Sequence, residues 1–207
     1  MKACQLVSKQ PGKPRYHPAP TESPVVPNRL NRAFQPTAPN HVWCGDITYV
    51  RMAGQWAYLA SVLDLYARRV VGWSLSTTPD TGLVAQALRR AIESRRPKPG
   101  LLFHSDQGVP YRSADYRHQF RQQQIQQSMS RKGNCWDNAP MERVFRSLKT
   151  EWIPPEGYQT FQEGQQDLTA YLMGYYNHER LHSYNNYQTP ERQEQLWQSP
   201  NTVSPNT

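Results

Sequence analysis

The sequence predicts an α/β protein with a five-stranded mixed sheet that is flanked by helices. Three strand-like runs follow one another closely from residue 41, as in an antiparallel meander. Helical and strand-like segments then alternate, as in a sheet that is covered by helices. We expect a Pro-rich basic arm or linker at residues 1–35, one folded domain at residues 36–195 and a disordered tail at residues 196–207.

The first three strands come from β-branched and aromatic runs. VWCGDITYV at residues 42–50 is followed by Gly54, which marks a turn. WAYLASVLDLY at residues 56–66 is apolar on both faces, which predicts a strand that is covered on both sides. RRVVGWSLS at residues 68–76 follows a short charged turn and completes the meander.

Helices and short strands alternate in the rest of the domain. The first helix has Asp80 or Thr81 as its N-cap, and a later helix begins near Pro140, since Pro is tolerated in a first turn. The other expected segments are a buried strand LLFHSD (101–106), a helix SADYRHQFRQQQ (113–124), a strand IQQSMS (125–130) and one long helix FQEGQQDLTAYLMGYYNHERLH (161–182).

The composition favours a polyanionic partner, most often nucleic acid. Lys and Arg number 24 against 16 Asp and Glu, so the formal net charge is +8. Ordinary solubility charge is the alternative explanation of this modest excess.

Cys4, Cys44 and Cys135 lack zinc-site spacing and predict reduced thiols. No apolar run reaches the ~20 residues that span a bilayer, and no signal peptide is present, so we expect a cytoplasmic, nucleoid-associated protein and no membrane partner.

Two stripes run along the helix that begins near Pro140. An apolar stripe faces the core, and a second stripe, about 100° away, carries Glu142, Arg146 and Lys149. On its own, the second stripe is typical of a solvated face with an ion pair. The apolar residues are Met141, Phe145, Leu148 and Trp152.

Three carboxylates fall at places that suit a metal site. Asp46 lies within the first strand, Asp106 at the end of the fourth strand and Glu142 on the helix, with 35 residues between Asp106 and Glu142. Carboxylate oxygens are the ligands that Mg²⁺ prefers, and it is often shared with substrate phosphates. Two such ions about 4 Å apart support phosphoryl transfer.

Other conspicuous residues have simpler roles. Asp64 ends the second strand and is expected to serve a turn or an ion pair, and Asp137 is expected to cap a helix. His104 is either a support for the metal site or, more simply, a buried histidine with satisfied hydrogen bonds. Trp43 and Trp136 either stack on bases or pack in the core.

These motifs resemble the second-frame transposase of the insertion-sequence-3 family of bacterial insertion sequences, which is similar to the retroviral integrase catalytic core. The resemblance covers roughly residues 36 to 195 and implies a ribonuclease-H-like fold. It implies metal-dependent DNA strand cleavage and strand transfer during transposition. The matching segments are VWCGDITYV, HSDQG, GNCWDNAPMERVFRSLKTEW and YYNHERLHSYNNYQTPE.

The resemblance also implies roles for particular residues. Asp46, Asp106 and Glu142 become the catalytic triad for two Mg²⁺ (or Mn²⁺) ions, and the partners become element ends, target DNA and further copies of the chain. Asn138 resembles a family asparagine, although an N-cap is its simpler role, and Arg180 either binds phosphate or packs with Tyr187. The DNA-binding candidates are Lys149, Arg146, Arg131, Lys132, Asn138 and Arg180.

Some features depart from the family pattern. Leu181 stands where the family usually has Pro, and the upstream helical material that helps to recognise element ends is absent from this sequence. A truncated copy or an alternate start is therefore expected. The alternatives to a transposase are a catalytically idle DNA-binding remnant and a ribonuclease-H-type nuclease that cuts without joining.

Overall fold

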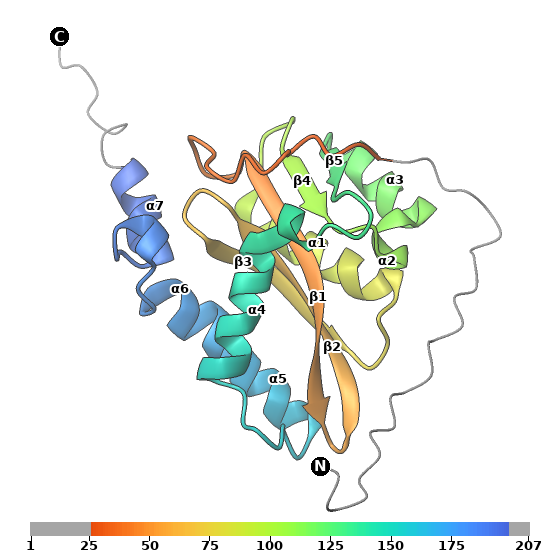
Figure 1. Ribbon diagram of the computed structural model, residues 1–207, viewed down its shortest axis with the longest axis vertical. Coiled ribbons are helices and arrows are strands. Elements are labelled where there is room, and N and C mark those ends of the chain that lie inside the picture. Colours follow the sequence, from red (N-terminus) through yellow and green to blue (C-terminus); the bar gives the residue numbers. More distant parts are fainter. Residues whose placement is uncertain (1–25, 199–207) are drawn as a thin grey trace, which may run out of the picture.

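The computed structural model describes residues 26–198 and shows a central sheet with helices on both faces (Figure 1). The strand order is β3-β2-β1-β4-β5. Strands β1, β2 and β3 pair antiparallel, whereas β4 and β5 continue the sheet in parallel from β1. The predicted five-stranded mixed sheet is therefore confirmed. The strands are β1 (Val42–Met52), β2 (Gln55–Asp64), β3 (Arg69–Ser76), β4 (Leu102–Ser105) and β5 (Gln126–Met129).

The two faces of the sheet bury separate cores. On one face lie α1 (Thr81–Arg95), α2 (Val109–Arg112) and α3 (Ala114–Gln122), and on the other lie α4 (Ala139–Glu151) and α5 (Phe161–Thr169). Along β1, Cys44 and Val50 belong to the core beneath α4, whereas Trp43 belongs to the core beneath α1. Because side chains alternate along a strand, Asp46 shares the α4 face with Cys44.

The start of α1 and the apolar stripe of α4 agree with the sequence. Asp80 caps α1, since its Oδ1 accepts from the Leu83 backbone N–H at 2.9 Å. The apolar stripe of α4 lies in the core, where Trp152 packs against its edge and donates from Nε1 to Asp167 at 2.7 Å. The buried α4 stripe residues are Met141, Phe145 and Leu148.

The C-terminal part differs from the prediction of one long helix at residues 161–182. Helix α5 runs into a π-helical stretch (Ala170–Tyr175) and then α6 (Tyr176–His178), where the helix ends. The amides of Glu179 and Arg180 both donate to the Tyr175 carbonyl, at 2.9 and 2.8 Å, which closes the last turn.

A further helix, α7 (Pro190–Gln198), was not predicted. The disordered tail assigned to residues 196–207 is wrong for residues 196–198, which lie in this helix, and residues 199–207 lie outside the described residues. Helix α7 forms because Pro190 suits a first turn and Thr189 Oγ1 accepts from the Arg192 amide at 3.2 Å.

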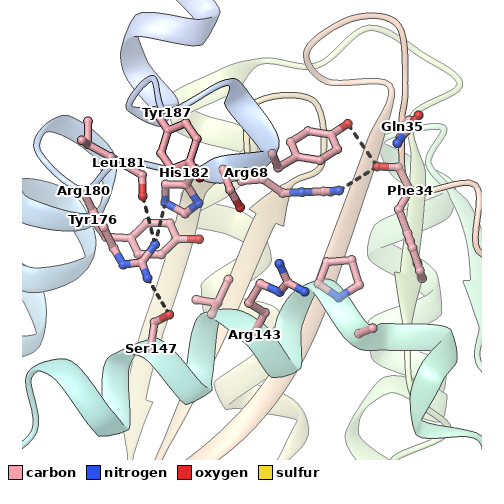
Figure 2. Close-up of a pocket in the computed structure, with 15 residues that line it drawn as sticks. Phe34, Gln35, Arg68, Arg143, Ser147, Tyr176, Arg180, Leu181, His182 and Tyr187 are labelled. Atoms are coloured by element: carbon pink, nitrogen blue, oxygen red, sulfur yellow. Dashed lines mark hydrogen bonds between the residues drawn. The ribbon is translucent and has the colours of Figure 1, made fainter.

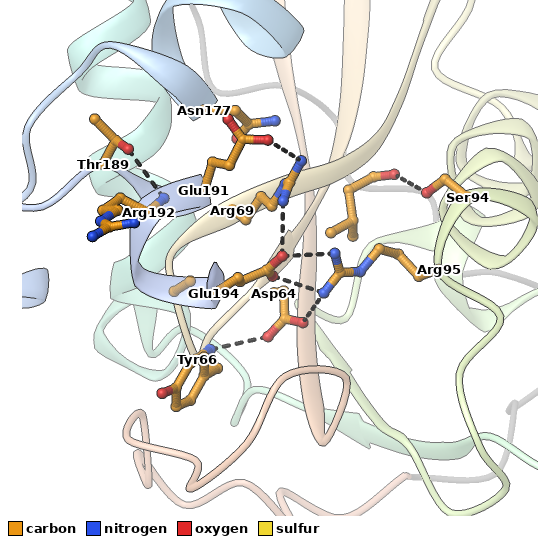
Figure 3. Close-up of polar contacts among 12 residues, drawn as sticks. Asp64, Tyr66, Arg69, Ser94, Arg95, Asn177, Thr189, Glu191, Arg192 and Glu194 are labelled. Atoms are coloured by element: carbon orange, nitrogen blue, oxygen red, sulfur yellow. Dashed lines mark hydrogen bonds and ion pairs between the residues drawn. The ribbon is translucent and has the colours of Figure 1, made fainter. Parts of the chain in front are cut away.

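Ion pairs hold α7 against the sheet (Figure 3). The buried Glu194 accepts from Arg69 at 2.8 Å and from Arg95 at 2.7 and 2.8 Å. Arg95 also lies 3.5 Å from Asp64, which accepts from the amides of Asn40 and Tyr66 as well. The prediction of turn and ion-pair duty for Asp64 is confirmed.

The last part of the expected arm belongs to the folded domain. Leu30 is buried, and the amides of Arg29 and Leu30 donate to Ser128 Oγ at 2.9 and 3.1 Å. The prediction of a linker was therefore wrong for residues 26–35, because Ser128 of β5 accepts hydrogen bonds from two backbone amides of this segment. Residues 1–25, with Cys4, lie outside the described residues. Cys44 and Cys135 are free thiols, and no helix within residues 26–198 is long and apolar enough to cross a membrane.

A first prediction concerns the close packing of α1 on β3 at Gly72. A Cβ at this position would lie 2.4 Å from the Ala87 carbonyl oxygen and 2.7 Å from the Ala91 Cβ. Gly72→Ala should therefore lower the free energy of unfolding by about 1–3 kcal/mol, measured by urea denaturation. Gly174→Ala is the matched control, since a Cβ there meets nothing within 4 Å. Equal urea midpoints for the two variants would contradict this packing.

A second prediction concerns the docking of α7. Glu194→Ala leaves two guanidinium groups without their shared carboxylate, which should release α7 from the sheet. We expect faster amide hydrogen exchange in residues 190–198, with little change in β1. Arg192→Ala, an exposed substitution on the same helix, should leave the exchange of α7 unchanged. The ion-pair account fails if both variants exchange alike.

Candidate active site

A cavity of about 520 Å³ opens between the start of α4, the middle of β1 and the ends of β4 and β5. All three predicted carboxylates line it, together with a loop that follows β5. The fold thus brings Asp46, Asp106 and Glu142 to one place, although they are far apart in the sequence. The other lining residues are Gln107, Gly108, Ser130, Arg131, Lys132, Gly133, Asn134, Cys135 and Asn138.

Asp46 is the most enclosed of the three acids. It is half-buried in β1, and its Oδ1 accepts from the backbone N–H of Ile47 at 2.8 Å. Burial raises the pKa of Asp46 to about 7, and repulsion from Asp106 and Glu142 adds to this rise. The raised pKa means that the charged form of Asp46 is disfavoured here unless a positive group lies beside it.

Asp106 and Glu142 are exposed and are carried by rigid elements. Asp106 follows the end of β4, where its Oδ1 accepts from the Gly108 amide at 2.9 Å. A Cβ on Gly108 would lie 2.9 Å from that same oxygen, so a larger residue there would displace the Asp106 carboxylate. Glu142 lies in the first turn of α4, where the helix dipole favours a carboxylate.

The chemistry of the three carboxylates suits a hard divalent cation. Three carboxylates offer only oxygen ligands, and their mutual repulsion would be relieved by a positive ion. Within residues 26–198, however, no three His, Cys, Asp or Glu side chains are close enough together to form a ready metal-binding group. The structure therefore supports a shared cavity for the carboxylates but not a closed coordination sphere.

Asn138 links α4 to β1. It occupies the N-cap position of α4, but its side chain caps no amide there. Instead its Nδ2 donates to the Gly45 carbonyl at 3.3 Å, beside Asp46, and its buried Oδ1 has no partner within the described residues. Asn138 therefore ties the helix that carries Glu142 to the strand that carries Asp46.

Asp137 was expected to cap a helix, and this is wrong. Its buried carboxylate accepts from Arg131 at 2.8 and 2.9 Å, from Arg32 at 2.8 Å and from Asn28 at 2.9 Å. The Arg131 guanidinium, together with Arg32, holds the pKa of Asp137 well below its usual range. This cluster fixes the loop at residues 130–138 and leaves Arg131 at the edge of the cavity.

The predicted DNA-binding residues separate into two groups. Arg131, Lys132 and Asn138 line the cavity with the carboxylates, whereas Lys149, Arg146 and Arg180 do not. Lys149 lies two turns along α4, about 10 Å away, and its Nζ is 3.9 Å from the ring centroid of Tyr49. Arg180 makes a two-point ion pair with Glu151, at 2.6 and 2.7 Å.

The histidine and tryptophan alternatives are also resolved. His104 is buried, with Nδ1 2.8 Å from Ser128 Oγ and Nε2 3.1 Å from Ser130 Oγ, so the interpretation as a satisfied histidine is supported. Trp43 is a core residue, whereas Trp136 is 70% exposed beside the cavity and core packing is wrong for it.

The loop after β5 carries the predicted DNA-binding candidates Arg131 and Lys132, but the sequence did not indicate that it forms a wall of the carboxylate cavity. Gln107 Nε2 donates to the Ser130 carbonyl at 2.9 Å, which joins this loop to the end of β4. The run RKGN, with Gly133 at a positive φ of 73°, is typical of a turn and was the available signal.

A third prediction concerns the Asp137 cluster. Asp137→Asn removes the charge from its bonds to Arg131 and Arg32, so the free energy of unfolding should fall by about 1–3 kcal/mol at neutral pH. Because pairing lowers the pKa of Asp137, this stabilisation is complete above the ordinary Asp pKa and is lost as the pH falls through the lower folded-state value. Urea denaturation at several pH values should therefore show a difference from the unmodified protein that shrinks only in strong acid. Asp115→Asn, on the exposed first turn of α3, is the control, and an equal effect of both variants would refute the cluster's role.

Comparison with solved structures supports the fold. An intasome structure of simian T-cell lymphotropic virus, in complex with a PP2A regulatory subunit, contains a chain that matches with a TM-score of 0.64 at 18% identity, over 85% of this chain and 60% of that one. The HTLV-2 integrase catalytic core domain in complex with magnesium (dimeric form) matches with a TM-score of 0.53 at 17% identity, over 76% of this chain and 98% of that one. The expected ribonuclease-H-like fold is confirmed.

Sequence relatives include several insertion-element proteins. The transposase for insertion sequence element IS904 of Lactococcus lactis is 42% identical over 165 residues, which are 80% of this chain and 65% of the relative. The transposase InsF for insertion sequence IS3A of Escherichia coli is 39% identical over 169 residues, which are 82% of this chain and 59% of the relative. The chain thus spans about three-fifths of the length of these curated relatives.

Two family models, both described as integrase core domain, match residues 36–135 and 123–190. Together they include β1, the end of β4 and α4, which carry the three carboxylates. The chain therefore belongs to the integrase core domain family and is similar to the transposases of bacterial insertion sequences.

Proposed function

We propose that this chain is a DDE polynucleotidyl transferase that cleaves DNA strands and transfers them to new positions during transposition. The observation that carries the proposal is the meeting of Asp46, Asp106 and Glu142 in one cavity with a basic edge. Relatives that are named transposases agree with this activity.

We infer that the carboxylates hold Mg²⁺ or Mn²⁺, with two ions expected. The oxygen-only donor set supports this inference, and so does the raised pKa of Asp46, which comes mainly from burial, with added repulsion from Asp106 and Glu142. When bound, such ions activate the attacking oxygen and stabilise the leaving oxygen in phosphoryl transfer. Asp46, Asp106 and Glu142 would act as ligands, on three elements that hold them in position.

The basic residues are proposed to bind the DNA. Arg131 is held by Asp137 at the edge of the cavity, and Lys132 is its neighbour there, so both suit the phosphates beside the scissile bond. Lys149 and Arg146 extend the exposed side of α4 away from the cavity. In this proposal they contact the DNA farther from the reacting phosphate, while Asn138 keeps α4 in place.

The partners of the proposed reaction are element ends, target DNA and further copies of the chain. Paired ends require more than one active site, and one structural relative is described as part of an intasome. Arg180 and Arg131 both pair with an acid, but the Arg180 side chain is only 21% exposed against 54% for Arg131, which supports a structural role for Arg180 rather than direct contact with DNA.

A fourth prediction tests the carboxylates. With Mg²⁺ or Mn²⁺ and a labelled element end, Asp46→Asn and Glu142→Gln should each lower strand transfer by about 10²- to 10³-fold, since the charge stabilisation by bound metal is worth several kcal/mol. Glu93→Gln, an exposed acid on α1, should retain full activity, and a chelator should abolish the reaction. The assay follows joined and cleaved products on a denaturing gel.

The alternatives give different products in this assay. Metal-dependent cleavage without joining would favour a ribonuclease-H-type nuclease. Binding of DNA without any metal-dependent product would favour an idle remnant. Full activity in either carboxylate variant would remove that residue from the proposed site.

A further inference from the structure

A second cavity, of about 500 Å³, lies on the other side of α4 (Figure 2). It is enclosed by the first turns of α4, by the end of the β2–β3 turn and by the segment that follows α6. Three arginines and several tyrosines line it, and no Asp or Glu does. The residues that matter here are Arg68, Arg143, Arg180, His182, Tyr184 and Tyr187.

Arg68 is fixed in place with unused hydrogen-bond donors. Its Nη1 donates to the Leu65 carbonyl and its Nη2 to the Phe34 carbonyl, both at 3.0 Å. The guanidinium also lies 3.7 Å from the ring centroid of Tyr184. A guanidinium has five N–H donors, so Arg68 retains donors for a ligand. Burial lowers the pKa of Arg68, and Arg143 adds repulsion.

Arg143 is the second cation without an acidic partner. It is exposed on α4, and within residues 26–198 its side chain makes no hydrogen bond or ion pair. Figure 2 shows its guanidinium rising from α4 into the space beneath Arg68. An anion could therefore bind the Arg143 guanidinium without breaking any hydrogen bond or ion pair among the described residues.

The other polar groups of the cavity leave this positive charge uncompensated. Arg180 is neutralised by Glu151, and its Nη2 donates to Ser147 Oγ at 3.0 Å. Burial, with repulsion from Arg180, Arg68 and Arg143, lowers the pKa of His182 to about 4, so this imidazole is neutral at physiological pH. The cavity thus presents two unpaired guanidinium groups beside a neutral ring.

We propose that this second cavity binds a phosphate of the DNA backbone, with Arg143 and Arg68 donating to its oxygens and Tyr187 stacking on an adjacent base or sugar. Guanidinium groups match phosphate oxygens in two-point contacts. Tyr187 is 69% exposed, which suits an aromatic platform for nucleic acid better than a core role. The net charge of +8 favours a polyanion over an acidic peptide of short length.

Arg143 is the neighbour of Glu142 on α4, which places the second cavity beside the first. Glu142 lines the first cavity and Arg143 lines the second, and successive helical residues point about 100° apart. DNA that crosses the N-terminal end of α4 would therefore meet both cavities. The inference rests on the proposed function in taking DNA as the ligand, but it requires no catalysis.

The test measures binding of a DNA duplex of arbitrary sequence by fluorescence anisotropy, with a chelator present and in the full chain. Arg143→Gln should weaken binding about tenfold and reduce the slope of log affinity against log salt by about 1. Arg143→Lys keeps the positive charge but loses the two-point contact of a guanidinium, so its DNA affinity should lie between those of Arg143→Gln and the unmodified protein. Arg89→Gln, which removes an exposed arginine from the opposite face of the sheet, is the matched control.

Two competitors separate the sources of the anion. Inorganic pyrophosphate and a polyglutamate peptide are titrated against each variant. The inference is overturned if Arg143→Gln binds DNA as tightly as Arg89→Gln does. It is also overturned if Arg143→Gln lowers the affinity for pyrophosphate alone, or for the peptide alone, and not for DNA. The binding test contains a chelator and needs no catalysis. If Arg143→Gln weakens DNA binding while the unmodified protein gives no strand transfer with Mg²⁺ or Mn²⁺, the proposed function is refuted and this inference stands.

Discussion

The packing of α4 against β1 is the constraint on which the candidate site depends. The apolar stripe of α4 is buried against the strand that carries Asp46, and Asn138 adds a hydrogen bond to the Gly45 carbonyl at the start of the helix. A rotation of α4 by one residue would exchange Glu142 for Arg143 in the carboxylate cavity, since neighbouring helical positions are about 100° apart. Burial of Met141 and Leu148 therefore decides which charge faces which cavity.

Charge is organised differently in the two parts of the molecule. Away from the cavities, buried acids are paired: Asp137 with Arg131 and Arg32, and Glu194 with Arg69 and Arg95. These pairs hold a loop and a helix in place, because a buried charge is tolerated when it is hydrogen-bonded. The three carboxylates of one cavity, and Arg68 and Arg143 of the other, make no ion pair among the described residues, although Arg131 and Arg180 at the cavity walls do. One collects carboxylates and the other collects guanidinium groups.

This separation gives the proposed DNA-processing role a physical basis. Burial of Asp46 beside Asp106 and Glu142 disfavours its charged form, and a bound cation would offset this cost. The unpaired Arg143 beside Arg68 is the same situation with the opposite sign. In one complex, a divalent ion would neutralise the carboxylates and the phosphates of DNA would neutralise the guanidinium groups.

The sequence by itself determined the strand and helix order, the α4 stripes and the three acidic residues. Local periodicity carries this information, since a strand alternates every two residues and a helix repeats every 3.6. Prediction from local periodicity failed where contacts with residues far away in the sequence order a segment. Residues 26–35 lack periodicity but are ordered by Ser128, and α7 is held by buried ion pairs with Arg69 and Arg95.

Only the tertiary structure decided which cations stand beside which acids. The spacing in the sequence put Lys149 on the stripe of Glu142, yet two helical turns separate it from the cavity and its ammonium lies on Tyr49. Arg131 reaches the cavity because Asp137 holds it, and Arg143 faces Arg68 because the β2–β3 turn folds over α4. Such neighbours depend on contacts between remote segments, which no local pattern records.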